Sequence, residues 1–327
     1  MRAAYYERTG PAREVLRVGE LETPEPGPGE VRVRLRASGV NPSDVKNRRG
    51  GPGRVMGFPL IVPHSDGAGE IDKLGEGVDG ARLGQRVWTW NAQFGRALGT
   101  AAQYVVLPEA QAVGLPEGTG FDIGACLGIP LLTAYRGVTL EGPVAGQTLL
   151  IAGGAGAVGH YAIQIAKRQG ATVLTTVSSA EKAAHARAAG ADHAIDYRRE
   201  DVAERVREIT DGRGVDRVLE VDLAGNVALA PQVLAHRGTV VVYGSNEGEV
   251  TLPFLPYLAN DISIRFYIVY RLDDRVRRAC EAALHELLEG GTLRHAIAAR
   301  YPLAETAAAQ EAVESGQVMG NVVIEIA

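Results

Sequence analysis

The sequence predicts an α/β protein in which a doubly wound parallel sheet is joined to a second, mostly β domain. From Thr148 to Tyr243 short apolar strands alternate with amphipathic helices, which is the pattern of a parallel sheet with helical crossovers. The segment before Ala102 is instead rich in Gly and Pro, with short apolar stretches between turns, as expected of an irregular antiparallel domain. With 327 residues, 46% of them hydrophobic, the chain is long enough to fill two cores.

The clearest strand of the β-rich part is Val31–Ala37, where apolar residues alternate with Arg32, Arg34 and Arg36. This period of two predicts a strand with one solvated face, so the arginines are a sheet signal and not a basic patch. Arg86–Trp90 is a second short strand candidate. No long helix is expected before residue 102.

The alternating part predicts strands and helices in regular succession. Strands are expected over Thr148–Ala152, Thr172–Val177, Val215–Val221 and Thr239–Tyr243, and helices over His160–Gln169, Ala180–Ala189, Asp201–Thr210 and Val227–Ala235. The apolar run Ile262–Leu272 contains Arg265 and Arg271, so we interpret it as a buried strand and its exit. A helix over Asp274–Glu289 and a closing strand over Val322–Ile326 follow, and these last elements can return to the first domain.

Charge and cysteine usage exclude several classes of function. Lys plus Arg total 34 against 39 Asp plus Glu, and the net charge of -5 offers no basic field for nucleic acid. Cys126 and Cys280 are far apart, which favours a reducing compartment and buried free thiols over a disulfide. Met1–Gly10 lacks the apolar core of a signal peptide, and no apolar run is long enough to cross a membrane. We therefore expect a cytoplasmic protein without a membrane partner.

A glycine-rich turn carries the strongest chemical signal. Gly154, Gly156 and Gly159 form a GxGxxG pattern between an apolar strand and a helix, and Ala155, Ala157 and Val158 complete the turn. We expect Gly154 to permit a tight turn, Gly156 to let the backbone approach a pyrophosphate, and Gly159 to let the helix pack closely on the strand. The alternative is a plain turn, since glycine is abundant in this chain. No Lys-Ser or Lys-Thr follows, which disfavours a nucleoside-triphosphate loop.

Several segments together resemble zeta-crystallin and its bacterial quinone reductase relatives. They are Ser38–Pro42, Pro63–Gly69, Gly128–Pro130 with Thr133–Arg136, the glycine-rich turn, Val241–Ser245, Tyr301–Leu303 and Gly320. The resemblance implies a GroES-like domain over residues 1–121 and 271–327, and a Rossmann NADPH-binding domain over residues 122–270, with the active site in the cleft between them. It also implies a homodimer, or possibly a tetramer, in which Ile262–Val269 is an edge strand suited to pairing across the interface.

The residues that zinc-dependent alcohol dehydrogenases need are missing. Asn41 replaces the cysteine of the corresponding segment, Ser65 stands at the histidine position, and His64 lies one residue too early. Two cysteines cannot form a four-cysteine lobe. Because a catalytic zinc needs about three protein ligands, we expect a metal-free enzyme.

Four positions depart from the pattern of the relatives, so the shape of the pocket cannot be copied from them. Lys46 replaces a tyrosine that contacts the cofactor in the family, and Gly50–Gly53 lacks an expected aromatic residue. His64 stands where relatives usually carry glycine, and we interpret it as a structural or pocket-lining residue more readily than a catalytic one. Asn321 stands where lysine is common. The roles of Lys46, His64 and Asn321 stay open.

Without a Lewis acid, the expected reaction is the reduction of quinones by NADPH. The rival reaction is reduction of an enoyl or alkenal double bond, and a non-enzymatic crystallin-like or RNA-binding role is the alternative from another class. Asn41 is the first candidate for a hydrogen bond near the nicotinamide or acceptor, although it can equally be a turn residue before Pro42. Thr133 is the candidate on the nicotinamide side, unless it bonds only its own helix backbone. By resemblance, the cofactor is lined by Gly244, Ser245, Ile268, Val269 and Tyr270.

NADPH is expected over NADH because the second strand of the nucleotide domain does not end in an acid. An Asp or Glu there would bind the ribose 2′-hydroxyl of NADH. Thr172–Val177 is followed by Ser178 and Ser179, with Lys182 one turn onward and Tyr197 beyond the next strand. These residues match the NADPH-binding set of the family, and Arg198 or Arg199 can add charge. Taken singly, each has an alternative role as a helix cap, a solvated side chain or a packing residue.

Overall fold

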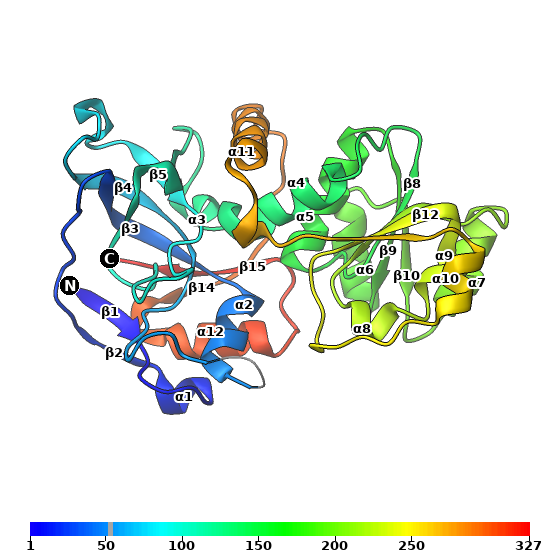
Figure 1. The fold of residues 1–327 in the computed structure, drawn as a ribbon, viewed down its shortest axis with the longest axis horizontal. Coiled ribbons are helices and arrows are strands. Elements are labelled where there is room, and N and C mark those ends of the chain that lie inside the picture. Colours follow the sequence, from blue (N-terminus) through cyan, green and yellow to red (C-terminus); the bar gives the residue numbers. More distant parts are fainter. Residues whose placement is uncertain (52–54) are drawn as a thin grey trace. The chain divides into compact units, whose positions relative to one another are not determined.

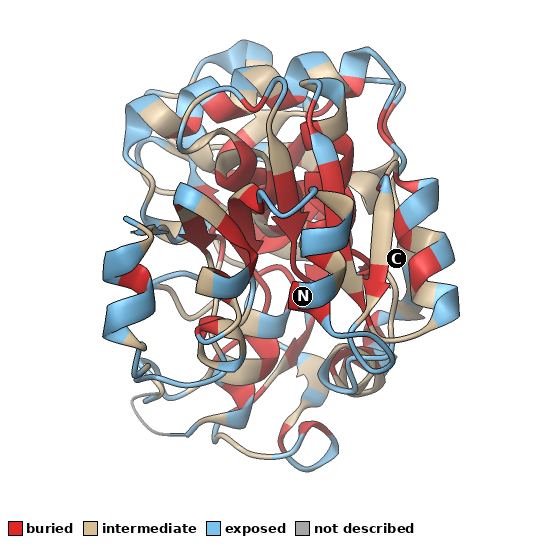
Figure 2. Cartoon of the chain, turned by 90° about the vertical axis from the view of Figure 1, so that its right-hand side faces the viewer, coloured by how far each residue is buried: buried red, intermediate tan, exposed pale blue. Residues whose placement is uncertain are grey.

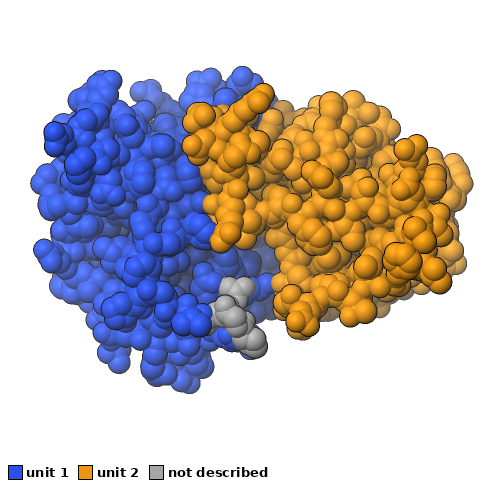
Figure 3. All heavy atoms as spheres, in the orientation of Figure 1, with its two compact units in different colours: residues 1–130, 281–327 blue, residues 131–280 orange. Residues whose placement is uncertain are grey.

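A computed structural model describes residues 1–51 and 55–327, and these form two compact units (Figure 3). Unit 1 comprises Met1–Pro130 with Glu281–Ala327, and unit 2 comprises Leu131–Cys280. The domain limits expected at residues 121 and 271 stay a prediction, and the compact units divide somewhat later along the chain. The first division lies after Pro130 because the Ile129 backbone still donates a hydrogen bond to Asp66 of unit 1, at 2.9 Å.

Unit 2 contains a six-stranded sheet in the order β10-β9-β8-β11-β12-β13, with every neighbouring pair parallel (Figure 1). The strands are β8 (Thr148–Ile151), β9 (Thr172–Val177), β10 (His193–Asp196), β11 (Val215–Glu220), β12 (Leu234–Val242) and β13 (Ser263–Phe266). The helices are α4 (Leu132–Thr139), α5 (Ala157–Arg168), α6 (Ala180–Ala188), α7 (Val202–Ile209), α8 (Leu223–Asn226), α9 (Ala230–Val233) and α10 (Phe254–Ala259). This strand order confirms the doubly wound Rossmann arrangement, whose ligands bind where the strand order reverses.

Two sequence expectations in unit 2 were wrong. The helix over Val227–Ala235 is replaced by a turn, the four-residue helix α9 and the start of β12. Pro231 explains the break, because proline has no N–H for a helix that begins earlier. The segment Ile262–Leu272 contains a strand, β13, at the edge of the sheet, as the family resemblance implies. It is not the buried strand expected from its apolar run, because Phe266 is 68% exposed.

Unit 1 is built around a seven-stranded sheet in the order β14-β15-β3-β4-β5-β7, with β6 also paired to β3. These strands are β3 (Glu30–Val40), β4 (Asp66–Leu74), β5 (Arg86–Thr89), β6 (Tyr104–Pro108), β7 (Ala112–Gly114), β14 (Ile297–Pro302) and β15 (Asn321–Glu325), and β1 (Arg2–Tyr5) pairs with β2 (Arg17–Glu20). The helices are α1 (Ala12–Val15), α2 (Pro42–Arg49), α3 (Phe121–Gly124) and α12 (Thr306–Glu314), and α11 (Asp274–Glu289) spans the second division between the units. Because β15 pairs with β3, the last elements do return to the first unit.

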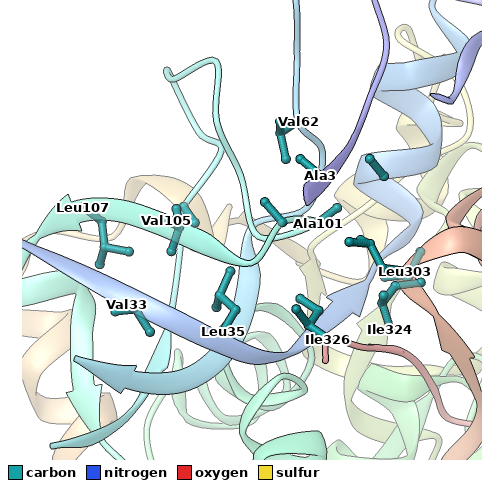
Figure 4. Close-up of a cluster of buried hydrophobic side chains, with 14 of the residues drawn as sticks. Ala3, Val33, Leu35, Val62, Ala101, Val105, Leu107, Leu303, Ile324 and Ile326 are labelled. Atoms are coloured by element: carbon teal, nitrogen blue, oxygen red, sulfur yellow. The ribbon is translucent and has the colours of Figure 1, made fainter. Parts of the chain in front are cut away.

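The core of unit 1 forms where the apolar side chains of β3 and β6 meet those of the terminal strand. Val33, Leu35, Val105 and Leu107 are almost fully buried and lie in one cluster with Ile324 (Figure 4). The arginines between them lie on the more exposed side of β3, as the alternation predicts. Figure 2 shows the same contrast between buried and exposed residues, with strands largely buried and the outer faces of helices exposed. The pairing of Gly39 with Asp66 places the C-terminal end of β3 beside the N-terminal end of β4, and this brings Asn41 and His64 into the same region.

Two further expectations can be compared directly with the structure. Cys126 and Cys280 are both buried and are not joined in a disulfide, as predicted. Among the described residues, no helix has the length and apolar character needed to span a membrane.

Candidate functional site

The glycine-rich turn joins β8 to α5 in unit 2. Gly156 is the N-cap of α5, and the Gly156 N–H donates to the Gly153 carbonyl at 3.0 Å. The Gly154 N–H donates to the Thr176 carbonyl at 3.2 Å, which fixes the turn against β9. The first N–H groups of α5 therefore lie at the carboxyl edge of the sheet, where a helix N-terminus binds an anion.

Glycine is needed at different positions of the turn for different physical reasons. Gly153 has a φ of +68°, so it is the residue that needs the left-handed conformation, and sequence reasoning had assigned the tight turn to Gly154. At Gly154 a Cβ would overlap the Thr175 hydroxyl, and at Gly159 it would overlap the Gly153 carbonyl oxygen. At Gly156 a Cβ would meet only that oxygen, at 3.3 Å. Gly154 and Gly159 are thus required for packing, whereas exposed Gly156 keeps space for a ligand.

The carboxyl end of β9 is followed by two serines, and the first carboxylate, Glu181, comes only in the first turn of α6. Ser178 follows the strand, and Ser179 is the N-cap of α6, its hydroxyl accepting the Lys182 N–H at 3.2 Å. The Tyr197 N–H donates to the Val177 carbonyl at 3.1 Å, so Tyr197 lies beside the same strand end, with its side chain 53% exposed. The structure therefore brings the four predicted residues to one edge of the sheet.

Thr133 is tied to the segment after β13 within unit 2. Thr133 is buried in the first turn of α4, and its carbonyl accepts the Tyr267 hydroxyl at 2.7 Å. Tyr267 directly precedes the predicted lining residues Ile268, Val269 and Tyr270, where a short 3₁₀ helix begins at Val269. Sequence reasoning missed Tyr267, which now links two candidate nicotinamide-side elements.

Gly244 and Ser245 follow β12 at the same edge of the sheet. The Gly244 carbonyl accepts the Leu223 N–H at 3.2 Å, and the Ser245 hydroxyl accepts the Glu247 N–H at 3.2 Å. A Cβ at Gly244 would approach the Val221 carbonyl oxygen to 2.5 Å. Glycine is therefore needed here for close packing of the two loops.

In unit 1, Asn41 is held by two buried acids. Asn41 is the N-cap of α2; its N–H donates to Asp44 Oδ2 at 2.8 Å and its Nδ2 donates to Asp66 Oδ2 at 2.9 Å. Asp66 also accepts the Ile129 N–H at 2.9 Å. Sequence reasoning missed both acids, although an acid three residues after an N-cap is the spacing of a capping box.

Neither acid forms an ion pair in the described part of the chain. Burial raises the pKa of Asp44 to about 7 and that of Asp66 well above its usual range, and hydrogen bonds from Asn41 oppose both shifts. Asp66 Oδ1 is buried without a hydrogen-bond partner. Burial therefore favours the neutral form of both acids, and the Asn41 amide is held in place by its hydrogen bond to Asp66.

His64 is buried in a hydrogen-bonded network of unit 1. Its Nδ1 lies 3.0 Å from the Ser38 hydroxyl and its Nε2 lies 3.1 Å from Gln310 Nε2. Gln310 in turn accepts a hydrogen bond from Arg48 Nε at 3.0 Å. His64 has a φ of +77°, a conformation that glycine adopts more easily. These contacts describe a structural side chain in a strained backbone position.

His64 should make the protein sensitive to acid. Burial lowers its pKa from 6.5 to about 3, so the folded state prefers the neutral ring. A lowered histidine pKa stabilises the protein above the unfolded value, and that stability is lost as pH falls from 6.5 toward about 3. Between about pH 7.5 and about pH 4.5 the loss is about 3 kcal/mol. The difference in unfolding free energy between the wild type and His64→Gly, measured by urea unfolding, should therefore decrease by this amount between these two pH values. A difference that does not change with pH would contradict the assignment.

The remaining predicted positions lie in unit 1. Lys46 is half-buried in the last turn of α2, and Asn321 Nδ2 donates to the Ala296 carbonyl at 3.0 Å. Of the segment Gly50–Gly53, residues 52 and 53 lie outside the described part of the chain. The contribution of Lys46 and Asn321 to a cofactor site stays a prediction.

The groups around Asn41 do not provide the ligands of a zinc site. The Asn41 amide nitrogen already donates a hydrogen bond to Asp66, and the other group bound to Asp66 is the Ile129 backbone N–H, which cannot bind a metal. Burial raises the pKa of the Cys126 thiol well above its usual range, which disfavours the thiolate that zinc requires. Across residues 1–51 and 55–327, no three His, Cys, Asp or Glu side chains are grouped as a metal site would need.

The fold and the glycine-rich turn define a nicotinamide-dependent oxidoreductase, and comparisons with known proteins agree. The family "Alcohol dehydrogenase GroES-like domain" matches residues 27–117, and "Zinc-binding dehydrogenase" matches residues 157–289. A quinone oxidoreductase of Pseudomonas aeruginosa is 35% identical, covering 95% of each chain, and a 2-haloacrylate reductase of a Burkholderia species is 32% identical, covering 99% of this chain and 98% of the relative.

Solved structures support the same assignment. A protein described as an NAD-dependent alcohol dehydrogenase has a TM-score of 0.90 at 31% identity and covers 100% of both chains. The Escherichia coli quinone oxidoreductase complexed with NADPH has a TM-score of 0.89 at 27% identity, covering 99% of this chain and 100% of the other. The chain belongs to the quinone oxidoreductase family of the medium-chain dehydrogenase/reductase superfamily.

Proposed function

We propose that this oxidoreductase uses NADPH to reduce quinones without a catalytic zinc. The observation that carries the proposal is the end of β9, where Ser178, Ser179 and Lys182 replace the acid that would select NADH. A 2′-phosphate would find hydroxyl donors and a cation there. Supporting this choice, the E. coli quinone oxidoreductase was solved with NADPH, although another similar structure is described as NAD-dependent.

The residues of the chain divide the work of binding and orientation. The turn at Gly156 and the N-terminus of α5 would hold the pyrophosphate, and Thr133 with Ile268–Tyr270 would hold the nicotinamide side. When bound, the nicotinamide supplies a hydride. The chain contributes mainly orientation, and Asn41, fixed by Asp66, would offer its amide near the nicotinamide or acceptor. We assign no general acid; solvent can protonate the product.

A specific relative favours a second candidate reaction, the reduction of an activated double bond. The 2-haloacrylate reductase is 32% identical over nearly the whole chain, and its substrate is a conjugated alkene. Initial rates with NADPH should be compared across menadione, other quinones, alkenals and 2-chloroacrylate. A kcat/KM at least about tenfold higher for quinones supports the proposal. The reverse order would replace it with the double-bond reductase.

We further propose that two copies pair along β13. This strand is one of the two edges of the six-stranded sheet; Phe266 within it and Ile268 just after it are 68% and 51% exposed. Phe254, Leu255 and Leu258 of α10 are also more than half exposed. An apolar edge strand of this kind is suited to isologous pairing with a second copy. Among the described residues, no comparable surface supports a tetramer or a nucleic-acid partner. We therefore expect filter binding to RNA at modest salt to stay at background.

Phe266→Glu should convert the dimer to a monomer. A carboxylate on the paired strand would be repeated by symmetry and would lose hydration on association. Light scattering at micromolar concentration should give twice the chain mass for wild type and the chain mass for the variant. Leu83→Glu, at an apolar residue of unit 1 that is 59% exposed, is the matched control and should stay dimeric. A monomeric wild type would refute the assembly.

A further inference from the structure

A pocket in unit 1 lies apart from the polar residues around Asn41 but shares helix α2 with them. Its volume is about 480 Å³, within the range of small-molecule sites. The described residues that line it are Tyr6, Asn47, Val55, Met56, Gly57, Phe58, Ile61, Gln93, Phe94 and Gly95. Asn47 belongs to α2, the helix that begins after Asn41. No lining side chain among these residues is charged, so the pocket is suited to a neutral ligand.

Tyr6 lines this pocket and is held in place by its neighbours. Its backbone N–H donates to the Ile61 carbonyl, and its carbonyl accepts the Ile61 N–H, both at 2.9 Å. Its ring packs with Ile61 and Met56 in one apolar cluster, and the residue is only 2% exposed. Small movements cannot turn the ring away, because both the backbone and the ring are held.

Tyr6 lines the pocket, and no side-chain hydrogen bond to its hydroxyl is found among the described residues. The hydroxyl is not one of the fully buried polar atoms that lack a partner, so it keeps access to water or to a ligand in the pocket. Burial, with a smaller contribution from the Asp44 carboxylate, raises the pKa of Tyr6 to about 12, so the phenol stays neutral and can donate. Arg48, the nearby cation, is engaged by Gln310 and Glu314 instead. The hydroxyl is therefore available to donate to a ligand in the pocket.

Aromatic side chains form the outer wall. Phe58 and Phe94 are 36% and 44% exposed, although each is large and apolar. The loop that carries Phe94 is rigid, because Arg96 Nε donates to the Ala92 carbonyl at 2.8 Å and Gln93 Nε2 donates to the Arg96 carbonyl at 2.9 Å. A fixed, exposed aromatic ring beside a pocket offers a flat surface on which another ring can stack.

We propose that this pocket binds the body of a neutral, flat, carbonyl-bearing acceptor, and that the Tyr6 hydroxyl donates a hydrogen bond to its carbonyl oxygen. The inference rests on the proposed function and makes it more specific. A quinone or aromatic enone has the required combination of an apolar ring and a carbonyl acceptor. A small anion such as 2-chloroacrylate gains little, since no described lining residue is a cation.

The test is equilibrium binding to the cofactor-free full-length enzyme, measured by calorimetry with two probes of similar shape. Menadione has carbonyl groups and naphthalene has none. Tyr6→Phe should weaken menadione about three- to tenfold and leave naphthalene unchanged. Phe94→Ala should weaken both probes by about three- to tenfold. Tyr5→Phe removes a neighbouring hydroxyl outside the pocket and should change neither.

The outcomes separate this inference from the proposed function. If menadione does not bind wild type, or binds Tyr6→Phe as tightly, the pocket assignment is overturned even if quinones are reduced. If menadione binding depends on Tyr6 but NADPH is not oxidised, the pocket assignment stands and the proposed reaction fails. In turnover assays the KM for menadione should rise in Tyr6→Phe while the KM for NADPH stays the same. Thermal unfolding of each variant confirms that the fold is retained.

Discussion

Gly156→Ala should raise the KM for NADPH by at least about tenfold while the unfolding temperature of the cofactor-free protein changes by less than about 2 °C. Gly156 is exposed, its φ of -74° suits alanine, and an added Cβ would meet only the Gly153 carbonyl oxygen, at 3.3 Å. The fold therefore tolerates the methyl group. A pyrophosphate approaching the N–H groups of α5 does not, because its oxygens would contact the Cβ before reaching the backbone.

Gly159→Ala is the matched comparison on the same turn, with the opposite expected result. Here the Cβ would overlap the Gly153 carbonyl and approach the Gly154 Cα to 2.9 Å. Displacing backbone costs about 1 to 3 kcal/mol, which corresponds to a fall of roughly 3 to 10 °C in unfolding temperature. Differential scanning calorimetry and NADPH titration together check both variants. A stable, tightly binding Gly156→Ala protein would show that the cofactor does not use this turn.

Lys182→Glu should reduce kcat/KM with NADPH by about tenfold to a hundredfold and change kcat/KM with NADH by less than about threefold. Lys182 follows the N-cap Ser179 at the end of β9, where the 2′-phosphate would lie. The substitution removes a charge-assisted donor and adds repulsion toward a phosphate, but it faces only a hydroxyl in NADH. Steady-state kinetics with both cofactors and a saturating quinone measure the ratio.

Arg187→Glu provides the same change of charge on the same helix, further from its N-terminus. Its effect on NADPH should be within about twofold, because screening weakens interactions between exposed charges beyond about 10 Å. An equal loss in both variants would indicate a general field effect and not a phosphate site. Equal or higher kcat/KM with NADH in the unmodified enzyme would show that Ser178, Lys182 and Tyr197 do not select NADPH.

Elements with a strong local period could be predicted from the sequence. The bounds of β9 and α11 agree with the expected ranges, because their apolar spacing is regular and their ends carry capping or turn residues. The helix expected at Val227 failed, since its apolar period continues across Pro231. The apolar composition of the run containing Phe266 predicted a buried strand, whereas the family resemblance implied an edge strand. Composition alone does not distinguish the central strands of a parallel sheet from an edge strand.

In the candidate site, too, local features could be predicted from the sequence and long-range contacts could not. The glycine-rich turn is local, so a short motif located it, and only the role of Gly153 needed coordinates. The contacts of Asp66 with Asn41 and Ile129 join residues 25 and 63 positions apart. No periodicity in a single sequence reports such pairs. Tyr6 and Phe94 likewise line one pocket only because the residue after β1 and the loop after β5 are brought together by folding.

The proposed reaction is the transfer of reducing equivalents from NADPH to quinones without zinc. The most direct measurement is the rate of NADPH oxidation with menadione by enzyme treated with a strong chelator, with zinc content determined on the same sample. We expect undiminished turnover at far less than one zinc per chain, and a lower kcat/KM with NADH than with NADPH. Loss of turnover that returns on adding zinc, or fully active enzyme that retains one zinc per chain, would contradict it.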